Sequence, residues 1–279
     1  MTNLIDAHQH YWNPARGDYG WMPADDPILS RAYGPADLAP LLAKNGIGHT
    51  ILVQAAPSIA ETEYMLGLAD ATPSIAGVIG WVDFERPDDL TALTRLAQHP
   101  RFLGVRPMIQ DLEDDNWMLR DDVQWGFQAV RDLGLRFEAL GFARHLKQFR
   151  TILTRYPEMA TVINHCMKPQ ICDPQSFGPW ADGMARLAAD TTTFCKLSGL
   201  VTEASADWTI AELQPYADHI LQVFGPGRVM WGSDWPVCQL ASSYDDWVTA
   251  ARTLTAGLSP ADQALIFGGT AATFYGLTA

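Results

Sequence analysis

The sequence predicts a single (β/α)8 barrel of the TIM type, and three observations support this fold class. Short apolar runs alternate with amphipathic helical stretches, and eight such units match the roughly 250 residues of a typical barrel. No Gly-rich turn follows the first strand, as the rival doubly wound open sheet would require. No repeat, low-complexity segment or long linker divides the chain, so we expect one domain over residues 1–279.

Eight segments are expected to be strands because they are short, apolar and rich in β-branched or aromatic residues. They are residues 4–10, 49–54, 76–84, 102–108, 135–140, 160–166, 192–200 and 228–235. The first of them, "LIDAHQH", places polar residues at every second position. Because strand side chains alternate between faces, Asp6, His8 and His10 are expected to share the face that points into the barrel.

The stretches between the strands are expected to be helices, and several carry start and stop signals. One helix opens after Pro35 and stops at Gly46, and Ser58 with Glu61 three positions later matches a capping box. The stretch 87–100 has acidic residues in its first turn and ends before a proline. Further helices are expected over 121–134, 143–157, 217–225 and 242–257, with a helical turn-and-cap region over 259–277.

The widest irregular stretch is residues 11–35, which is rich in Trp, Tyr, Pro and Gly. It follows the first strand directly. In a barrel, the loops after the strands lie over the C-terminal mouth, where active sites are built. We therefore expect this long loop to cover the mouth.

Composition and charge exclude several classes of partner. The formal net charge of −13 disfavours nucleic acid and anionic membranes, although one or two arginines can still hold a small anionic substrate. No apolar run reaches the ~18 residues of a membrane span, and no signal peptide is visible. The four cysteines form no CxxC pair and are expected to be reduced thiols. These features predict a cytoplasmic enzyme with a small-molecule substrate, and leave a homo-oligomer open.

Four residues are expected to converge at the open end of the barrel. Asp234 ends the eighth strand in "WGSDWP", and in a closed barrel that strand pairs with the first, next to His8 and His10. His165 ends the sixth strand at the same end. Two neutral imidazoles that lie close together can share a metal ion, so this cluster is a candidate metal site.

Other charges also fall in or at the ends of strands. Arg106 is suited to orient a carbonyl or carboxylate, and a structural salt bridge is the equal alternative. Glu138 and Lys196 lie inside apolar runs, and because buried charges usually require a partner, we expect them to pair within the barrel. The alternative is that either reaches the site, with Glu138 as a further metal ligand.

Residues for substrate contact are expected around these groups. Gln54 and Asp83 end the second and third strands and are placed to bind substrate hydroxyls. Trp12, Trp21 and Trp235 are placed to form a wall against a ring. No GxSxG, P-loop, GxGxxG or HExxH motif offers another chemistry.

Five segments, "DAHQHYW", "GVRP", "INHCMKP", "KLSGL" and "WGSDWPV", together resemble the amidohydrolase superfamily, and within it the sugar-acid lactonases of the amidohydrolase-2 branch (L-fuconolactonase and L-rhamnonolactonase-like proteins). The resemblance covers nearly the whole chain and implies an amidohydrolase-type barrel. It maps the metal ligands to His8, His10, His165 and Asp234, and implies one divalent metal ion, zinc, held weakly or dispensable. The chain departs from the binuclear members, because "GVRPM" replaces their fourth-strand lysine or glutamate, and Glu138 stands where a fifth-strand histidine is expected.

The reaction that these residues favour is hydrolysis of a cyclic ester. Asp234 is expected to take a proton from the attacking water, while His8, His10 and His165, with or without the metal, polarise the carbonyl. Asp234 and His165 are thus the expected catalytic residues, and Arg106 and the aromatic residues hold the ring.

Three alternatives remain open from the sequence. One is a hydrolase of an aromatic-degradation lactone such as a pyrone dicarboxylate, which needs converging arginines. The others are a zinc-dependent non-oxidative decarboxylase and a binding protein without catalysis. The few cations near the expected mouth favour a neutral sugar lactone, and they are Arg16, Arg31, Arg106, Arg144 and Lys168.

Overall fold

The computed structural model describes residues 4–277, and eight parallel strands at its centre form a nearly closed barrel. Each strand pairs with the next one along the chain, which gives the predicted (β/α)8 barrel. The strands are β1 (Leu4–Gln9), β2 (Ile47–Val53), β3 (Ile75–Gly80), β4 (Phe102–Val105), β5 (Arg136–Ala139), β6 (Thr161–Ile163), β7 (Phe194–Leu197) and β8 (Val229–Trp231). A parallel bridge between Gln9 and Trp235, and a hydrogen bond of 2.8 Å from Asp234 N–H to the His8 carbonyl, join the chain after β8 to β1.

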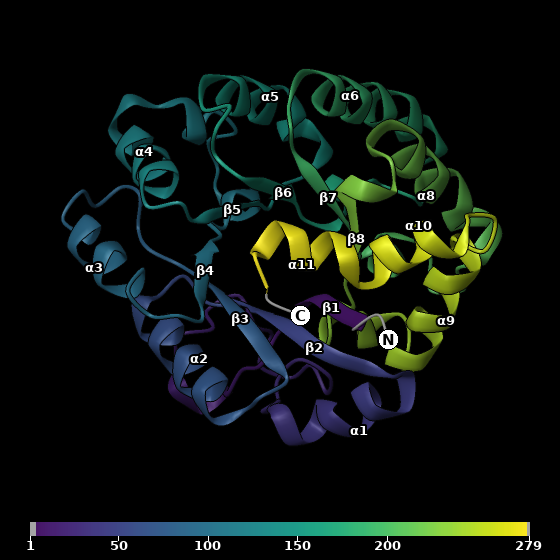
Figure 1. The fold of residues 1–279 in the computed structure, drawn as a ribbon, viewed down its shortest axis with the longest axis horizontal. Coiled ribbons are helices and arrows are strands. Elements are labelled where there is room, and N and C mark those ends of the chain that lie inside the picture. Colours follow the sequence, from purple (N-terminus) through teal and green to yellow (C-terminus); the bar gives the residue numbers. More distant parts are fainter. Residues whose placement is uncertain (1–3, 278–279) are drawn as a thin grey trace.

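Helices surround the strands, as Figure 1 shows. They are α1 (Pro35–Asn45), α2 (Ile59–Ala71), α3 (Asp89–Leu96), α4 (Gln124–Asp132), α5 (Leu146–Arg155), α6 (Phe177–Asp190), α7 (Leu200–Glu203), α8 (Ile210–Phe224), α9 (Tyr244–Leu254), α10 (Pro260–Ala264) and α11 (Thr270–Tyr275). The main hydrophobic core lies between this layer and the outer faces of the strands. Within residues 4–277, no helix has the length and apolar character that crossing a membrane demands.

Most predicted helices are present, with three differences. α6 and the short α7 were not among the predicted helices, and α8 begins at Ile210, seven residues before the predicted start at 217. The start of α1 at Pro35 and its end before Gly46, which has φ +71°, match the prediction. Ser58 caps α2 by accepting from Glu61 N–H, but the Glu61 carboxylate accepts from other N–H groups, those of residues 55 and 56, so only half of the capping box forms.

The N-terminal end of the barrel is closed by α11, which lies across it in Figure 1. Ala271, Phe274 and Tyr275 of α11 belong to one buried apolar cluster with inward residues of the strands. Those strand residues are Ile5, Ala7, Ile51, Val53, Ile79, Val162 and Met230. Because side chains fill this half, a ligand can reach the barrel centre only from the C-terminal end.

Asp6 does not share the inward face of β1, so the prediction that placed it with His8 and His10 is wrong. Its Oδ1 accepts from Ser233 N–H at 2.8 Å, and its Oδ2 accepts from the hydroxyl of Tyr244 on the outer helix α9 at 3.1 Å. Asp6 therefore ties β1 to the segment after β8 and to α9.

The physical reason is an irregularity in the pairing of β1 with β2. Asp6 pairs with Thr50 whereas Gln9 pairs with Leu52, so β1 holds one residue more than β2 over this interval. Such a β-bulge interrupts strict alternation of side chains. The apolar neighbours of Asp6 consequently point inward, and the two histidines that follow still reach the barrel centre.

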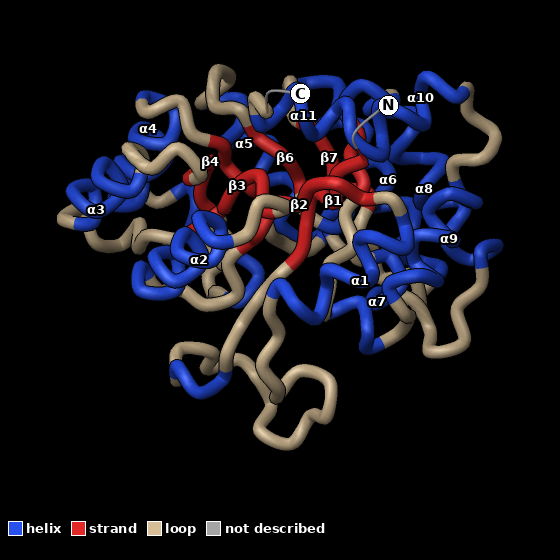
Figure 2. The backbone as a smooth tube through the Cα atoms, turned by 60° about the horizontal axis from the view of Figure 1, so that its bottom comes forward, coloured by secondary structure: helices blue, strands red, loops and turns tan. Residues whose placement is uncertain are grey.

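The long loop after β1 extends beyond the strands (Figure 2) and is tied at its base. Trp12 and Tyr33 form an antiparallel bridge across the two ends of the loop. The Trp12 indole N–H also donates to the carbonyls of Leu29 and Arg31, at 3.1 and 2.9 Å. These bonds fold the loop into a compact structure over the C-terminal end.

Candidate active site

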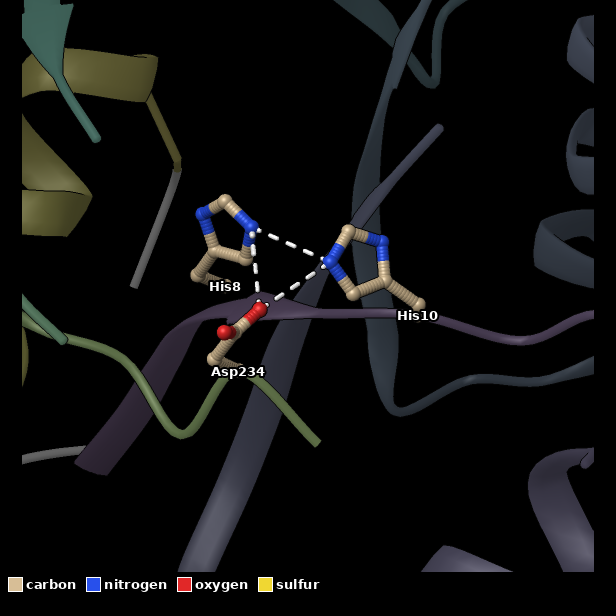
Figure 3. Close-up of side chains that lie close together, drawn as sticks. All are labelled: His8, His10 and Asp234. Carbon is tan, nitrogen blue, oxygen red and sulfur yellow. Dashed lines mark hydrogen bonds and ion pairs between the residues drawn. The ribbon is translucent and has the colours of Figure 1, made fainter. Parts of the chain in front are cut away.

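Three of the expected residues meet at the C-terminal end of the barrel. Asp234 Oδ1 lies 3.2 Å from His10 Nε2 and 3.7 Å from His8 Nε2, and the two ring nitrogens are 3.2 Å apart (Figure 3). All three residues are at least 95% buried. The predicted adjacency of Asp234 and the first-strand histidines is therefore present, and it results from barrel closure.

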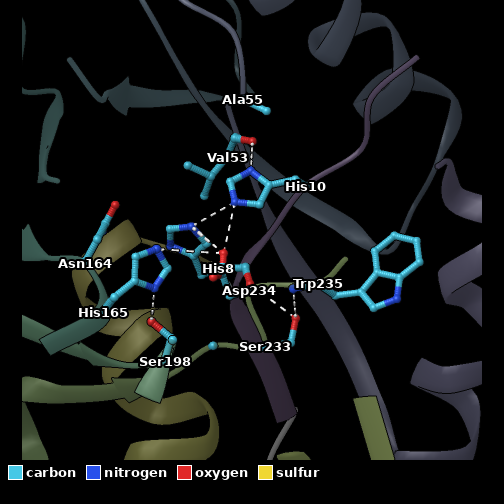
Figure 4. A network of polar contacts seen from close by, with 12 residues as sticks. His8, His10, Val53, Ala55, Asn164, His165, Ser198, Ser233, Asp234 and Trp235 are labelled. Carbon is cyan, nitrogen blue, oxygen red and sulfur yellow. Dashed lines mark hydrogen bonds and ion pairs between the residues drawn. The ribbon is translucent and has the colours of Figure 1, made fainter. Parts of the chain in front are cut away.

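His165 follows β6 and stands on the other side of this cluster (Figure 4). Its Nε2 lies 3.8 Å from Asp234 Oδ1, and its Nδ1 lies 2.9 Å from the hydroxyl oxygen of Ser198. The rings of His165 and His8 are 4.4 Å apart between centroids. All four expected residues thus surround one point.

The backbone that presents His165 and Asp234 is in the left-handed region, which is uncommon for residues other than glycine. Asp234 has φ +57°, and the four residues from His165 to Lys168 have φ between +47° and +59°. This conformation costs roughly 1–2 kcal/mol for each residue. Strain of this kind persists where the surrounding structure imposes it, and it clusters at functional sites.

The hydrogen bond of His10 fixes which of its nitrogens carries the proton. Nδ1 lies 2.7 Å from the carbonyl oxygen of Val53, which can only accept, so Nδ1 is the donor. Burial lowers the pKa of His10, so the ring is neutral and Nε2 presents a lone pair to the centre. Metal-ligating histidines typically have this arrangement, with a carbonyl or carboxylate behind the ring.

Behind His8 lies a buried ion pair rather than a carbonyl. The Lys196 ammonium is 2.7 Å from both carboxylate oxygens of Glu138 and 3.2 Å from His8 Nδ1. The predicted pairing of Glu138 and Lys196 is confirmed by these distances. Glu138 also accepts from the Tyr275 hydroxyl at 2.5 Å and from the Asn164 amide at 3.0 Å. The structure therefore does not bring Glu138 to the cluster around Asp234.

Burial and neighbouring charge set the ionisation of the centre. Burial alone would raise the pKa of Asp234, but the neighbouring His165, His10 and Lys168 outweigh it and lower this pKa to about 2. Burial lowers the pKa of His165 to about 3 and that of Lys196 to about 8. At neutral pH the centre thus combines an ionised carboxylate with neutral imidazoles.

A cavity of about 350 Å³ opens onto the cluster. It is lined by His10, Trp12, Trp21, Leu29, Ala55, Arg106, Met108, Gln110, Asp111, Leu140, His165, Lys168, Asp234, Val237 and Leu240. A neighbouring cavity of about 530 Å³ shares three of these residues and contains Asp83. The long loop contributes walls to both cavities, and its Trp21 is 38% exposed.

Two expected contact residues do not line either cavity. The Gln54 side chain is fully buried and donates to the Arg106 carbonyl at 2.7 Å. Trp235 is 1% exposed and packs edge-on against Tyr11 and Tyr33. The side chains of both residues point away from the mouth of the barrel. They therefore pack behind the residues that line the cavity and support them.

Only two of the five candidate cations line the smaller cavity, namely Arg106 and Lys168. The other three are held by carboxylates elsewhere: Arg16 by Asp18 (2.8 Å), Arg31 by Asp37 (3.6 Å) and Arg144 by Asp115 (2.8 Å). Arg106 donates to the Gln54 carbonyl and lies 3.4 Å from both Asn164 Oδ1 and His8 Nε2. The convergence of arginines that a dicarboxylate requires is therefore missing from the residues that line this cavity.

The donor atoms suit a divalent metal ion, with one exception. One ligand atom each from His8, His10 and Asp234 lies within 4.8 Å of the others, and nitrogen and carboxylate oxygen are donors that zinc accepts. Nε2 of His10, Oδ1 of Asp234 and Nε2 of the adjacent His165 are turned toward one point. The exception is His8, whose outer partner is a cation.

Ser198 is a site residue that the sequence does not predict, whereas Lys168 was expected only as one of the cations near the mouth. Lys168 lines the cavity and stands three residues after His165, at the end of the left-handed segment. Ser198 follows β7 in "KLSGL", and its hydroxyl orients His165. Their position just after a strand is the signal that indicates them, since these segments form the mouth of a barrel.

Comparison with known proteins gives a consistent picture. The profile of the amidohydrolase family matches residues 5–277. A relative from Burkholderia ambifaria named L-fucono-1,5-lactonase is 39% identical, with 99% of this chain and 96% of the relative covered. A second L-fucono-1,5-lactonase, from Burkholderia multivorans, is 35% identical over 98% of this chain and 96% of its own.

A solved structure resembles the whole fold. It is a crystal structure of an amidohydrolase from Burkholderia multivorans with bound zinc, and it is 33% identical to this chain. The two superpose with a TM-score of 0.94, covering 99% of this chain and all of the other.

Proposed function

The chain belongs to the amidohydrolase family, and on this premise we propose that it hydrolyses a sugar-acid lactone by water attack on the ring ester carbonyl. The observation that carries the proposal is the position of the Asp234 carboxylate beside the imidazoles of His10 and His165, in the lining of a cavity that Trp12 and Trp21 also line. The names of the two full-length relatives support the same substrate class.

Asp234 is the proposed general base. Its carboxylate is ionised at neutral pH and accepts the proton of a water molecule that attacks the carbonyl. His165, placed by Ser198 and 3.8 Å from Asp234, orients that water and takes part in returning the proton to the leaving alkoxide. Ring opening yields a free carboxylic acid and one hydroxyl group.

Arg106 and Lys168 are proposed to stabilise the negative charge that develops on the carbonyl oxygen. Both cations line the cavity, and Arg106 is 96% buried beside the cluster. A fixed positive charge in a site from which water is excluded stabilises an oxyanion more strongly than it would in water. Trp12 and Trp21 then bracket the lactone ring through their apolar faces.

A divalent ion, for which we propose zinc, would be held by His10, His165 and Asp234. When bound, it supplies Lewis-acid polarisation of the substrate carbonyl. The residues described above act on the substrate and the water themselves, so we expect the metal to be held weakly or to be dispensable.

The charge of the cavity favours a neutral polyhydroxylated lactone over a dicarboxylate. The lining of the cavity contains two cations, Arg106 and Lys168, and two carboxylates, Asp111 and Asp234, so its positive charges are balanced. A pyrone dicarboxylate would bring two further negative charges. A neutral sugar lactone brings none, and its hydroxyl groups can donate to Asp111 and to Asp83 in the adjoining cavity.

The test is turnover of a substrate panel, followed by acid release in a weakly buffered indicator assay with an enzyme-free blank for spontaneous lactone opening. The panel contains L-fucono-1,5-lactone, other aldonolactones of five- and six-membered ring, and 2-pyrone-4,6-dicarboxylate. We expect the highest kcat/KM on an aldonolactone. Turnover of the dicarboxylate alone, or release of carbon dioxide from an aromatic acid without any lactone turnover, would refute the proposal.

A further inference from the structure

His8 differs from the other two histidines of the site because both of its ring nitrogens face cations. Nδ1 lies 3.2 Å from the Lys196 ammonium, and Nε2 lies 3.4 Å from a guanidinium nitrogen of Arg106. His10 has a carbonyl behind its ring, and His165 has a hydroxyl.

A neutral imidazole has one N–H group and one lone pair, so His8 can accept from only one of these cations. Neither lysine nor arginine has a lone pair to offer in return. Whichever tautomer forms, the single lone pair of His8 is already engaged or faces a cation. A metal ion at Nε2 would add a third positive charge to the ring's surroundings.

The contacts of the two cations decide which one His8 accepts from. Arg106 has other acceptors, the Gln54 carbonyl and the Asn164 side chain. Lys196 is fully buried, and in the described residues its hydrogen bonds go to Glu138 and His8. An ammonium has three protons, of which two meet the carboxylate oxygens, so the third requires the lone pair of His8 Nδ1.

The position of Lys196 is itself fixed from the closed end of the barrel. Glu138 is fully buried and accepts from the Tyr275 hydroxyl at 2.5 Å, and Tyr275 belongs to α11. The chain of contacts therefore runs from the helix that closes the barrel, through Glu138 and Lys196, to a histidine of the site.

We propose that Lys196 is a positioning residue that holds His8 as the tautomer with a proton on Nε2, so that His8 donates a hydrogen bond into the centre and does not ligate a metal ion. The Nε2–H group faces the lone pair of His10 Nε2 at 3.2 Å and lies 3.7 Å from Asp234 Oδ1. That this N–H group donates to the carbonyl oxygen of a lactone rests on the proposed function, whereas the assignment of the proton to Nε2 does not.

The tautomer is measured by nitrogen NMR on the full chain with histidine-selective ¹⁵N labelling after metal removal by EDTA. The His8 signals are identified by their loss in His8→Asn. We expect a pattern in which Nε2 is protonated and Nδ1 is not. A His8 ring protonated at Nδ1 in the wild-type protein would overturn the proposal.

Lys196→Gln is the matched variant, because its amide group can donate to Glu138 and turn its oxygen to the histidine. An acceptor opposite Nδ1 should move the proton of His8 from Nε2 to Nδ1. A spectrum of Lys196→Gln in which His8 keeps the wild-type tautomer would show that Lys196 does not set it. The wild-type spectrum alone decides the ring state if this variant does not fold.

Zinc affinity, measured by competition with a fluorescent chelator, provides a second readout. We expect His8→Asn to bind zinc as the wild type does within error, and His10→Asn to bind it at least about tenfold more weakly. Equal weakening by the two substitutions would overturn the proposal. Neither readout uses a substrate, so failure here is distinguishable from failure of the lactonase proposal.

Discussion

Replacing Lys196 with methionine is expected to lower the free energy of unfolding by about 3–5 kcal/mol, because it leaves a buried carboxylate without its cation. The Lys196 ammonium is 2.7 Å from both oxygens of Glu138, and both side chains are fully buried. Methionine has a similar length, so the loss reflects the unpaired charge rather than a cavity. The hydroxyl of Tyr275 and the amide of Asn164 still donate to Glu138 but cannot neutralise it.

The expected change is large enough to measure in two ways. For a chain of 279 residues the entropy of unfolding is roughly 0.6 kcal/mol per kelvin, so Tm should fall by about 5–8 °C. Urea unfolding followed by tryptophan fluorescence and circular dichroism gives the free energy directly.

The control is a double-mutant cycle with Glu138→Gln. If the charge is the cause, the double variant Lys196→Met/Glu138→Gln should be more stable than Lys196→Met alone, with a coupling energy of at least about 1–2 kcal/mol. A loss below about 1 kcal/mol for Lys196→Met, together with additive effects in the cycle, would refute the reasoning.

Three further predictions concern the site. Burial lowers the pKa of His165 from 6.5 to about 3, so the unfolded chain binds more protons than the folded chain and stability is lost as pH falls below 6.5. His165→Gln should reduce the slope of the free energy of unfolding against pH by up to about 1.4 kcal/mol per pH unit. Urea titrations between about pH 6 and pH 4 that give an unchanged slope would contradict this. Arg106→Lys should lower kcat/KM roughly 10–100-fold, because an ammonium lacks the forked guanidinium that reaches both the Gln54 carbonyl and the centre of the site. Steady-state rates near those of the wild type would exclude the role of Arg106 in stabilising the oxyanion. Trp21→Ala should raise KM about tenfold at unchanged kcat because this wall binds the ground and transition states alike, whereas a fall in kcat alone would place Trp21 in the chemical step.

The sequence predicts the elements whose signal is local and repeated. All eight strands lie within or beside the predicted segments, because each is a short apolar run between turn signals. Eight parallel strands predict a barrel, and in a barrel the end of β8 lies next to β1. The approach of Asp234 to His8 and His10 was therefore predictable as well. The pair of Glu138 and Lys196 was also predictable, since two charges inside apolar runs have few alternatives to each other.

Features that depend on three-dimensional context were not predictable. α6 contains Gly178, Pro179 and Gly183, which obscure its helical pattern, although its buried face packs well in the fold. The bulge in β1 turns Asp6 outward, and no residue in "LIDAHQH" indicates an extra position. The direction in which Gln54 leaves the end of β2 depends on the carbonyl of Arg106, which follows β4, two strands away.

The most direct test of the central claim is the kcat of Asp234→Asn on an aldonolactone, with circular dichroism to show that the variant is folded. Asparagine keeps the shape of Asp234 but cannot take a proton from water. A fall in kcat of at least ~10²-fold is the predicted result. A folded variant that keeps most of the wild-type kcat would contradict the assignment of lactone hydrolysis to this carboxylate.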